Sequence, residues 1–310
     1  MKMIQNYPRL WIALMGVSLL ITLLSMGEVF ASTSTVLAAL LILLVGIPHG
    51  AADHQIFQQL YTDLRGRRAL VFFYVAYLGL MGFVFLLWYL FPVVAFLVFV
   101  FLSCYHFGQG NFTYLSGDDW PSRGLFIVWG IWIIAVPVLS NYSEAQPVLN
   151  TLLNKDLPLL SPVLIKQLVL LLTLIVIGWL GLLSPRLTGN LLLKEVFSLL
   201  ALGVMFWYTP LFLGFAVYFA LWHALPSALD QITFLWQQKT RANLWKYCKT
   251  VLPFSMLALG ALGTVAWWIP VEEISLYWSW LFVFIAAVTL PHMLLLDRVY
   301  QRLLAEKPIE

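Results

Sequence analysis

Residues 163–183 read VLIKQLVLLLTLIVIGWLGLL, a nearly continuous apolar run whose single charge is Lys166. About 20 apolar residues are enough for an α-helix to cross the hydrocarbon core of a bilayer. A membrane β-barrel would instead require segments of roughly ten residues with alternating polarity. Because this run does not alternate, it predicts a transmembrane helix, and its repetition along the chain would predict an all-α fold.

Similar runs fill the rest of the 310-residue chain, which is 62% hydrophobic and 10% charged. The mean hydropathy of +0.91 is far above that of an ordinary soluble domain. We therefore expect a polytopic transmembrane helix bundle that forms a single transmembrane domain over residues 1–310. Ten helices are expected, near 10–30, 34–53, 69–91, 92–115, 124–141, 163–183, 190–208, 209–228, 249–270 and 274–296, with a longer loop at 142–162. Eight helices remain possible if the tight turn at Phe91–Pro92 or Tyr208–Pro210 is a kink or a re-entrant segment.

The basic residues predict how the chain is oriented. With ten spans, all of the 17 lysines and arginines except Lys155 and Lys166 fall on one side of the membrane. That side is predicted to be cytoplasmic and to hold both termini, because cytoplasmic loops are enriched in Lys and Arg. The acidic residues assigned to the opposite loops are Glu28, Glu144, Asp156, Glu272 and Glu273. The net charge of +3 is too small to suggest a nucleic-acid partner.

The five histidines are predicted to lie at one depth in the membrane. His49, His106, His223 and His292 fall in the cytoplasmic halves of helices that all run from outside to inside, and His54 follows at the same face. Polar groups inside a membrane are costly and usually face the bundle interior. A shared metal site is therefore expected, although each histidine could instead be satisfied separately by a neighbouring carbonyl or hydroxyl group.

Several polar residues close to these histidines in sequence are candidates for supporting roles. Neutral imidazole suits iron, zinc, copper and nickel, and a ligating histidine usually donates from its other ring nitrogen to an acceptor. The candidates are Asp53, Asp230, Gln109 and Tyr105. Asp297 is another, although it could simply face water.

Four strings of residues resemble, in order, the motifs of the Brp/Blh family of bacterial and archaeal membrane β-carotene 15,15'-dioxygenases. They are Gly46-Ile-Pro-His-Gly-Ala-Ala-Asp-His54, Tyr105-His-Phe-Gly-Gln109, Trp222-His223 and Leu290-Pro-His-Met293. The resemblance extends from about residue 40 to residue 297.

The resemblance implies that O2 cleaves the central double bond of β-carotene to give two molecules of all-trans-retinal. It also implies Fe(II) as the metal, a multi-pass location in the cell (inner or plasma) membrane among its lipids, and a pathway link to a microbial rhodopsin. The family's proposed ligands correspond here to His49, His106 and His223. Many members have a further histidine four residues after the Trp-His pair, where this chain has Ser227. The fourth ligand is then His292, His54 or a water molecule, and we favour His292 because it comes from a separate helix.

Aromatic residues near these histidines are candidates for lining a channel for the polyene. A carotenoid has no polar handle, so a long apolar channel must place its central double bond at the metal. The candidates are Phe107, Phe112, Phe215, Tyr218, Phe219 and Trp222. Helix packing or a membrane-interface belt is the alternative explanation for each of them.

Two other function classes remain as alternatives, besides a haem-binding electron carrier. One is another membrane non-haem iron enzyme, such as a lipid desaturase or hydroxylase, but the HxxxH and HxxHH strings typical of those enzymes do not occur in this sequence. The other is a transporter or proton-relay protein with titrating histidines, which would be expected to pair carboxylates at mid-membrane positions. The acidic residues here lie mostly at the ends of the predicted spans.

Overall fold

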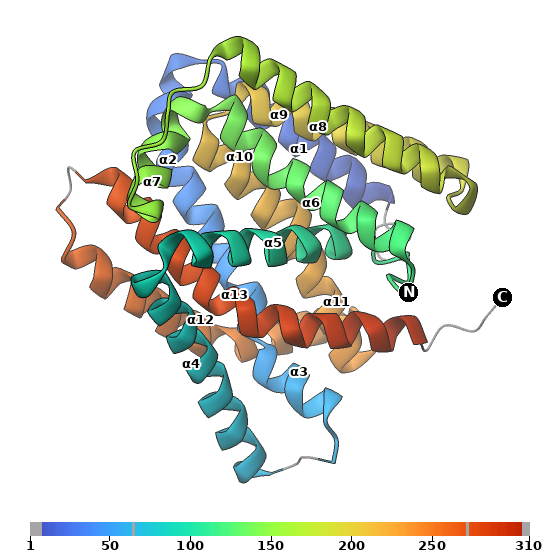
Figure 1. Ribbon diagram of the computed structural model, residues 1–310. Coiled ribbons are helices and arrows are strands. Elements are labelled where there is room, and N and C mark those ends of the chain that lie inside the picture. Colours follow the sequence, from blue (N-terminus) through green and yellow to red (C-terminus); the bar gives the residue numbers. More distant parts are fainter. Residues whose placement is uncertain (1–7, 64–65, 271–272, 306–310) are drawn as a thin grey trace. The chain divides into compact units, whose positions relative to one another are not determined.

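The protein is helical almost throughout, as Figure 1 shows. The computed structural model describes residues 8–63, 66–270 and 273–305, and no strand occurs among them. The all-α prediction is therefore confirmed. Its cytoplasmic termini stay a prediction, and four of the charged residues considered for the orientation, Lys2, Arg65, Glu272 and Lys307, lie outside the described residues.

The number of helices agrees with the predicted count of about ten. In the described part of the chain, nine helical segments are long and apolar enough to cross a membrane: Thr33–Leu60, Arg67–Leu90, Pro92–Asn111, Trp120–Ser140, Pro162–Arg186, Gly189–Tyr208, Leu211–Trp236, Arg241–Trp267 and Ile274–Arg302. A shorter apolar helix, Arg9–Ser25, occupies the first predicted span. One helix ends at Leu90 and another at Tyr208, and a new helix begins within three residues of each, so both tight turns separate distinct helices.

The chain divides into two compact units. Unit 1 extends to Ile42 and also holds Val100–Gln146 and Leu157–Pro226, while unit 2 holds Leu43–Phe99, Pro147–Asp156 and the chain from Ser227 onward. The prediction of one domain over residues 1–310 stays a prediction.

The helices of unit 1 are α1 (Pro8–Ser25), α2 (Glu28–Leu41), α6 (Trp120–Ser140), α8 (Pro162–Leu183), η3 (Ser184–Arg186), α9 (Gly189–Tyr208), α10 (Leu211–Val217) and the π-helix η4 (Tyr218–Ala224), with the second half of α5 (Pro92–Asn111) and the start of α7 (Tyr142–Leu153). Unit 2 holds the other parts of α5 and α7 with most of η1 (Ile42–Gly46), η2 (Ile47–Gly50), α3 (Asp53–Leu60), α4 (Arg67–Leu90), most of α11 (Leu225–Trp236), α12 (Arg241–Trp267) and α13 (Ile274–Ala305).

In unit 1, α5 and α6 approach each other closely enough for their backbones to touch. A Cβ atom added at Gly108 would lie 2.0 Å from the carbonyl oxygen of Phe126, and one at Gly130 would lie 1.9 Å from that of Cys104. Small residues permit such approaches between membrane helices, where packing and not the hydrophobic effect drives association. The crossing fixes the half of α5 that carries His106.

Replacing Gly130 by alanine is expected to destabilise the protein by about 1–3 kcal/mol, the usual cost of overpacking. The obstacle is the backbone at Cys104, which cannot rotate away as a side chain can. The measurement is the thermal unfolding midpoint in detergent. Gly178→Ala on α8 is the control, because nothing lies within 4 Å of its added Cβ. Equal midpoints for the two variants would contradict the proposed contact.

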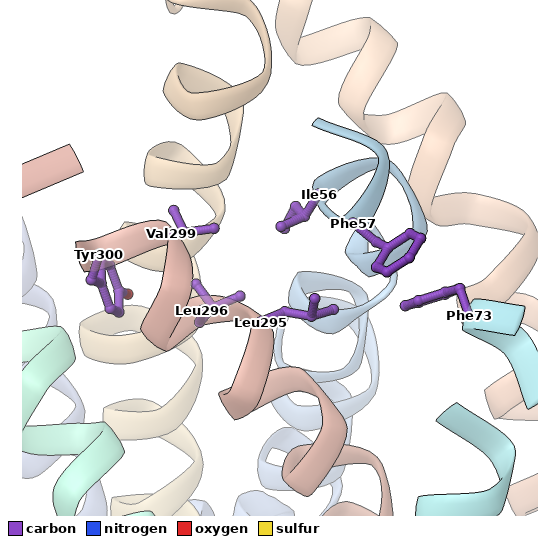
Figure 2. Packing of buried hydrophobic residues seen from close by; sticks show 7 residues of the cluster. All are labelled: Ile56, Phe57, Phe73, Leu295, Leu296, Val299 and Tyr300. Carbon is purple, nitrogen blue, oxygen red and sulfur yellow. The ribbon is translucent and has the colours of Figure 1, made fainter. Parts of the chain in front are cut away.

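Unit 2 has an apolar cluster that joins α3, α4 and α13, shown in Figure 2. Its buried members are Ile56, Phe57, Phe73, Leu295, Leu296, Val299 and Tyr300. The cluster packs α3 against α13. It thereby brings Asp53, at the start of α3, close to His292 on α13. Residues far apart in the sequence thus become neighbours through ordinary side-chain packing.

Several predicted boundaries were wrong. The predicted loop at 142–162 contains α7, because Pro147 removes only one backbone donor and Pro162 occupies the first position of α8, where proline is favoured. The fourth predicted helix ends at Asn111, and the last one continues to Ala305. The fifth begins at Trp120 because the Asp119 carboxylate caps it, accepting from the Ser122 N–H at 2.8 Å.

Candidate metal centre

His49 and His292 form a buried pair in unit 2. Their ring centroids are 4.9 Å apart and the rings are nearly perpendicular, at 86°. The side chains come from positions 243 residues apart (292 minus 49) in η2 and α13. The segment that carries His49 is irregular, since a π-helical turn at Ile42–Gly46 leads into the short 3₁₀ helix Ile47–Gly50. Such departures from α-helical geometry are often found at functional sites.

Both imidazoles of this pair direct Nδ1 toward an acceptor. The Nδ1 atom of His292 lies 2.8 Å from Oδ1 of Asp53, and Nδ1 of His49 contacts the carbonyl oxygen of Gly46. When Nδ1 of a neutral imidazole carries the proton, the lone pair lies on Nε2. This is the arrangement by which outer residues orient metal-ligating histidines.

The backbone of His49 is held by a second set of polar side chains. Its carbonyl oxygen accepts a hydrogen bond from Gln231 Nε2 at 2.7 Å. The hydroxyl of Tyr247 donates to Gln231 Oε1 at 3.0 Å, and Ser227 Oγ accepts from Gln231 Nε2 at 3.4 Å. Ser227, which follows the Trp222-His223 pair by four residues, thus belongs to the network that supports His49.

His106 and His223 form a second buried pair, in unit 1. Their ring centroids are also 4.9 Å apart, with an interplanar angle of 75°. His106 lies on α5, and His223 lies in the π-helix Tyr218–Ala224. The helix that leads to His223 starts where Glu144 accepts from the Leu211 N–H at 3.0 Å. Burial raises the pKa of Glu144, and this hydrogen bond opposes the shift.

Two of the six predicted channel aromatics adjoin His223, and a third packs on one of them. Phe107 meets its ring edge-on at a centroid distance of 4.7 Å, Phe219 stacks on it at 5.9 Å, and Phe215 stacks on Phe219 at 5.9 Å. These rings make one side of the pair apolar.

The other three predicted channel aromatics have contacts typical of helix packing. Tyr218 packs against Phe107 and Phe206. Phe112 is completely buried against Phe126 and Trp129. Trp222 donates from Nε1 to Ser18 Oγ at 2.9 Å, which ties the π-helix to α1.

The remaining predicted site residues lie in varied surroundings. His54 is half-buried, and its ring packs on Phe254 at 4.6 Å. Asp53 adjoins His292, as described above. Gln109 and Asp230 are buried in units 1 and 2, respectively. Tyr105 packs edge-on against Phe126 at 5.8 Å.

Imidazole nitrogen is a donor that suits iron, and the structure buries four imidazoles in two pairs. In unit 2, acceptors at Nδ1 orient both rings. Within residues 8–63, 66–270 and 273–305, no three His, Cys, Asp or Glu side chains form a group that could hold a metal ion. What the structure brings together is one histidine pair in each unit. That all four imidazoles bind one cation stays a prediction.

Comparison with known proteins identifies the family. The family model described as beta-carotene 15,15'-dioxygenase matches residues 40–300. The chain belongs to the beta-carotene 15,15'-dioxygenase family. It is 25% identical over 273 residues to a beta-carotene 15,15'-dioxygenase of an uncultured marine bacterium, 66A03, covering 85% of this chain and 93% of that protein. No solved structure matches the chain.

In this member of the dioxygenase family, the sequence did not point to three residues of the unit 2 network. They are Tyr77, whose hydroxyl donates to Asp53 Oδ2 at 2.9 Å, and Gln231 and Tyr247, which support the backbone of His49. Tyr77 and Tyr247 are two of the 13 tyrosines in an aromatic-rich chain, and neither adjoins a histidine. Gln231 lies four residues after Ser227, so one helical turn separates it from the departure in the family motif.

Proposed function

We propose that this chain uses O2 to cleave the central double bond of β-carotene and releases two molecules of all-trans-retinal. The observation that carries the proposal is membership of the beta-carotene 15,15'-dioxygenase family over residues 40–300. The reaction balances without another reductant, since each carbon of the broken double bond takes one oxygen atom as an aldehyde. The buried histidine pairs are the polar groups that we assign to this chemistry.

We further propose Fe(II) as the metal, with His49, His106, His223 and His292 as its ligands. When bound, ferrous iron with neutral nitrogen ligands supplies open positions at which O2 is activated beside an alkene. The Gly46 carbonyl and Asp53 would then orient Nε2 of His49 and His292, and the burial of all four imidazoles would exclude water. Support comes from the four sequence motifs and from the burial of each histidine beside a second one.

His292 is the better candidate than His54 for the ligand that replaces the one missing at Ser227. His292 lies beside His49 with Asp53 behind it. His54 packs on Phe254 instead and is only half-buried. The carboxylate at Nδ1 is a typical partner of a metal-ligating histidine.

We propose that Phe107, Phe215 and Phe219 contribute apolar surface along which the polyene lies next to His223. Stacked and edge-on rings provide rigid apolar area at a low cost in side-chain entropy. Apolar helices that could cross a membrane would let substrate enter from the lipid in which it dissolves. The proposed setting is the cell (inner or plasma) membrane, and the product would serve a microbial rhodopsin.

Expression in cells that accumulate β-carotene tests the function. We expect the orange colour to fade and retinal to appear in extracts, with retinal as the major product by chromatography. The His106→Ala variant serves as the matched control for expression burden. Carotene that persists unchanged, together with purified protein that binds no iron, would refute the assignment.

A further inference from the structure

A buried carboxylate links three helices next to the His49–His292 pair. Asp53 is 3% exposed and begins α3. Its Oδ1 lies 2.8 Å from Nδ1 of His292 on α13, and its Oδ2 accepts a hydrogen bond from the Tyr77 hydroxyl on α4 at 2.9 Å. The two carboxylate oxygens therefore have different partners.

The Tyr77 hydroxyl is also close to the helix that carries His292. It lies 3.3 Å from the carbonyl oxygen of Val288, four residues before His292 and thus one turn away. A phenol has one proton to donate, and the shorter contact is to Asp53. Tyr77 thus lies where it can fix both the orientation of the carboxylate and its distance from α13.

We propose that Tyr77 and Asp53 act together as positioning residues for His292. Tyr77 holds the carboxylate so that Oδ1 accepts the Nδ1–H of His292, and this leaves the ring lone pair on Nε2, directed at the metal. The inference rests on the proposed function, because it assumes that His292 binds the iron. It adds Tyr77, which does not itself contact the proposed ligand atom.

The negative charge of Asp53 explains why asparagine cannot replace it between His292 and Tyr77. A carboxylate only accepts hydrogen bonds, so its partners must both donate. An asparagine at this position could turn its NH2 group toward His292, and Nδ1 would then accept and Nε2 would carry the proton. Such a tautomer cannot ligate through Nε2. Charge-assisted hydrogen bonds of this kind are stronger than neutral ones, and burial raises the cost of losing them.

The test is anaerobic titration of metal-free protein in detergent with Fe(II), in competition with a chelator. We expect Tyr77→Phe to bind about tenfold more weakly than wild type and Asp53→Asn up to about 100-fold more weakly, the range for residues behind metal ligands. Tyr74→Phe is the matched control: it lies one turn earlier on α4 and packs on Phe73 and Phe254, and we expect wild-type affinity.

Two further measurements separate positioning from a purely structural role. The unfolding midpoint of the metal-free protein measures the structural cost: Tyr77→Phe should lower it relative to Tyr74→Phe, because Oδ2 of the buried Asp53 loses its donor, and Fe(II) affinities are compared at a temperature below both midpoints. In a His292→Ala background, Tyr77→Phe should have no additional effect on Fe(II) affinity, because residues that act through one another are not additive.

Tyr77→Phe affinity within twofold of Tyr74→Phe, or a full additive effect in the His292→Ala background, would overturn the inference alone. If Tyr77→Phe does not fold, Asp53→Asn decides in the same way. Wild-type protein that binds no Fe(II) would refute the proposed function and the inference with it.

Discussion

Replacing either His106 or His223 by alanine is expected to abolish retinal formation, with a fall of at least about 100-fold. Changes behind a metal ligand already cost 10–100-fold, and loss of an imidazole donor should cost no less. The two rings lie 4.9 Å apart and are 3% and 5% exposed, so water cannot easily take the place of either. Retinal yield and bound iron are to be measured together in protein purified from the membrane fraction.

Ser103→Ala is the matched control for this pair of variants. Ser103 lies on α5 one turn before His106 and is equally buried, at 2% exposed. We expect it to retain both iron and activity, because a serine hydroxyl is a poor substitute for imidazole as an iron ligand. Full activity in His106→Ala or His223→Ala would remove that residue from the proposed metal site.

Replacing His292 by alanine is expected to lower retinal formation by a similar factor, whereas His54→Ala should keep most of the activity. His292 is 2% exposed, lies beside His49 and is oriented by Asp53. Its removal also leaves the Asp53 carboxylate without the imidazole at Oδ1, which adds a desolvation cost. His54 contacts Phe254, so its loss should affect only local packing.

Iron content distinguishes the two histidines independently of turnover. We expect His292→Ala to lose iron during purification and His54→Ala to keep the wild-type stoichiometry. The reverse result, iron retained in His292→Ala and lost in His54→Ala, would assign the fourth ligand to His54. Membrane insertion of both variants is checked by their yield in the membrane fraction.

The helices could be predicted from hydropathy because a bilayer forces the backbone to satisfy its own hydrogen bonds, so long apolar runs become helices. Their ends were less predictable. Pro147 was expected to break the chain into a loop, yet α7 extends through it. The π-helical turns at Ile42–Gly46 and Tyr218–Ala224 also gave no signal, because a single extra residue in a turn leaves no mark on hydropathy.

The sequence alone determined which family the chain resembles and which histidines are candidates for the metal site, since short motifs with fixed spacing carry that information locally. Only the tertiary structure decided which imidazoles are neighbours. It also decided that Asp53 contacts Nδ1 of His292, although His54 is nearer in sequence, and that the Tyr77 hydroxyl donates to the same carboxylate. The physical reason is distance along the chain. Asp53 and His292 are 239 residues apart (292 minus 53), and packing of α3, α4 and α13 around one apolar cluster brings them within hydrogen-bonding distance.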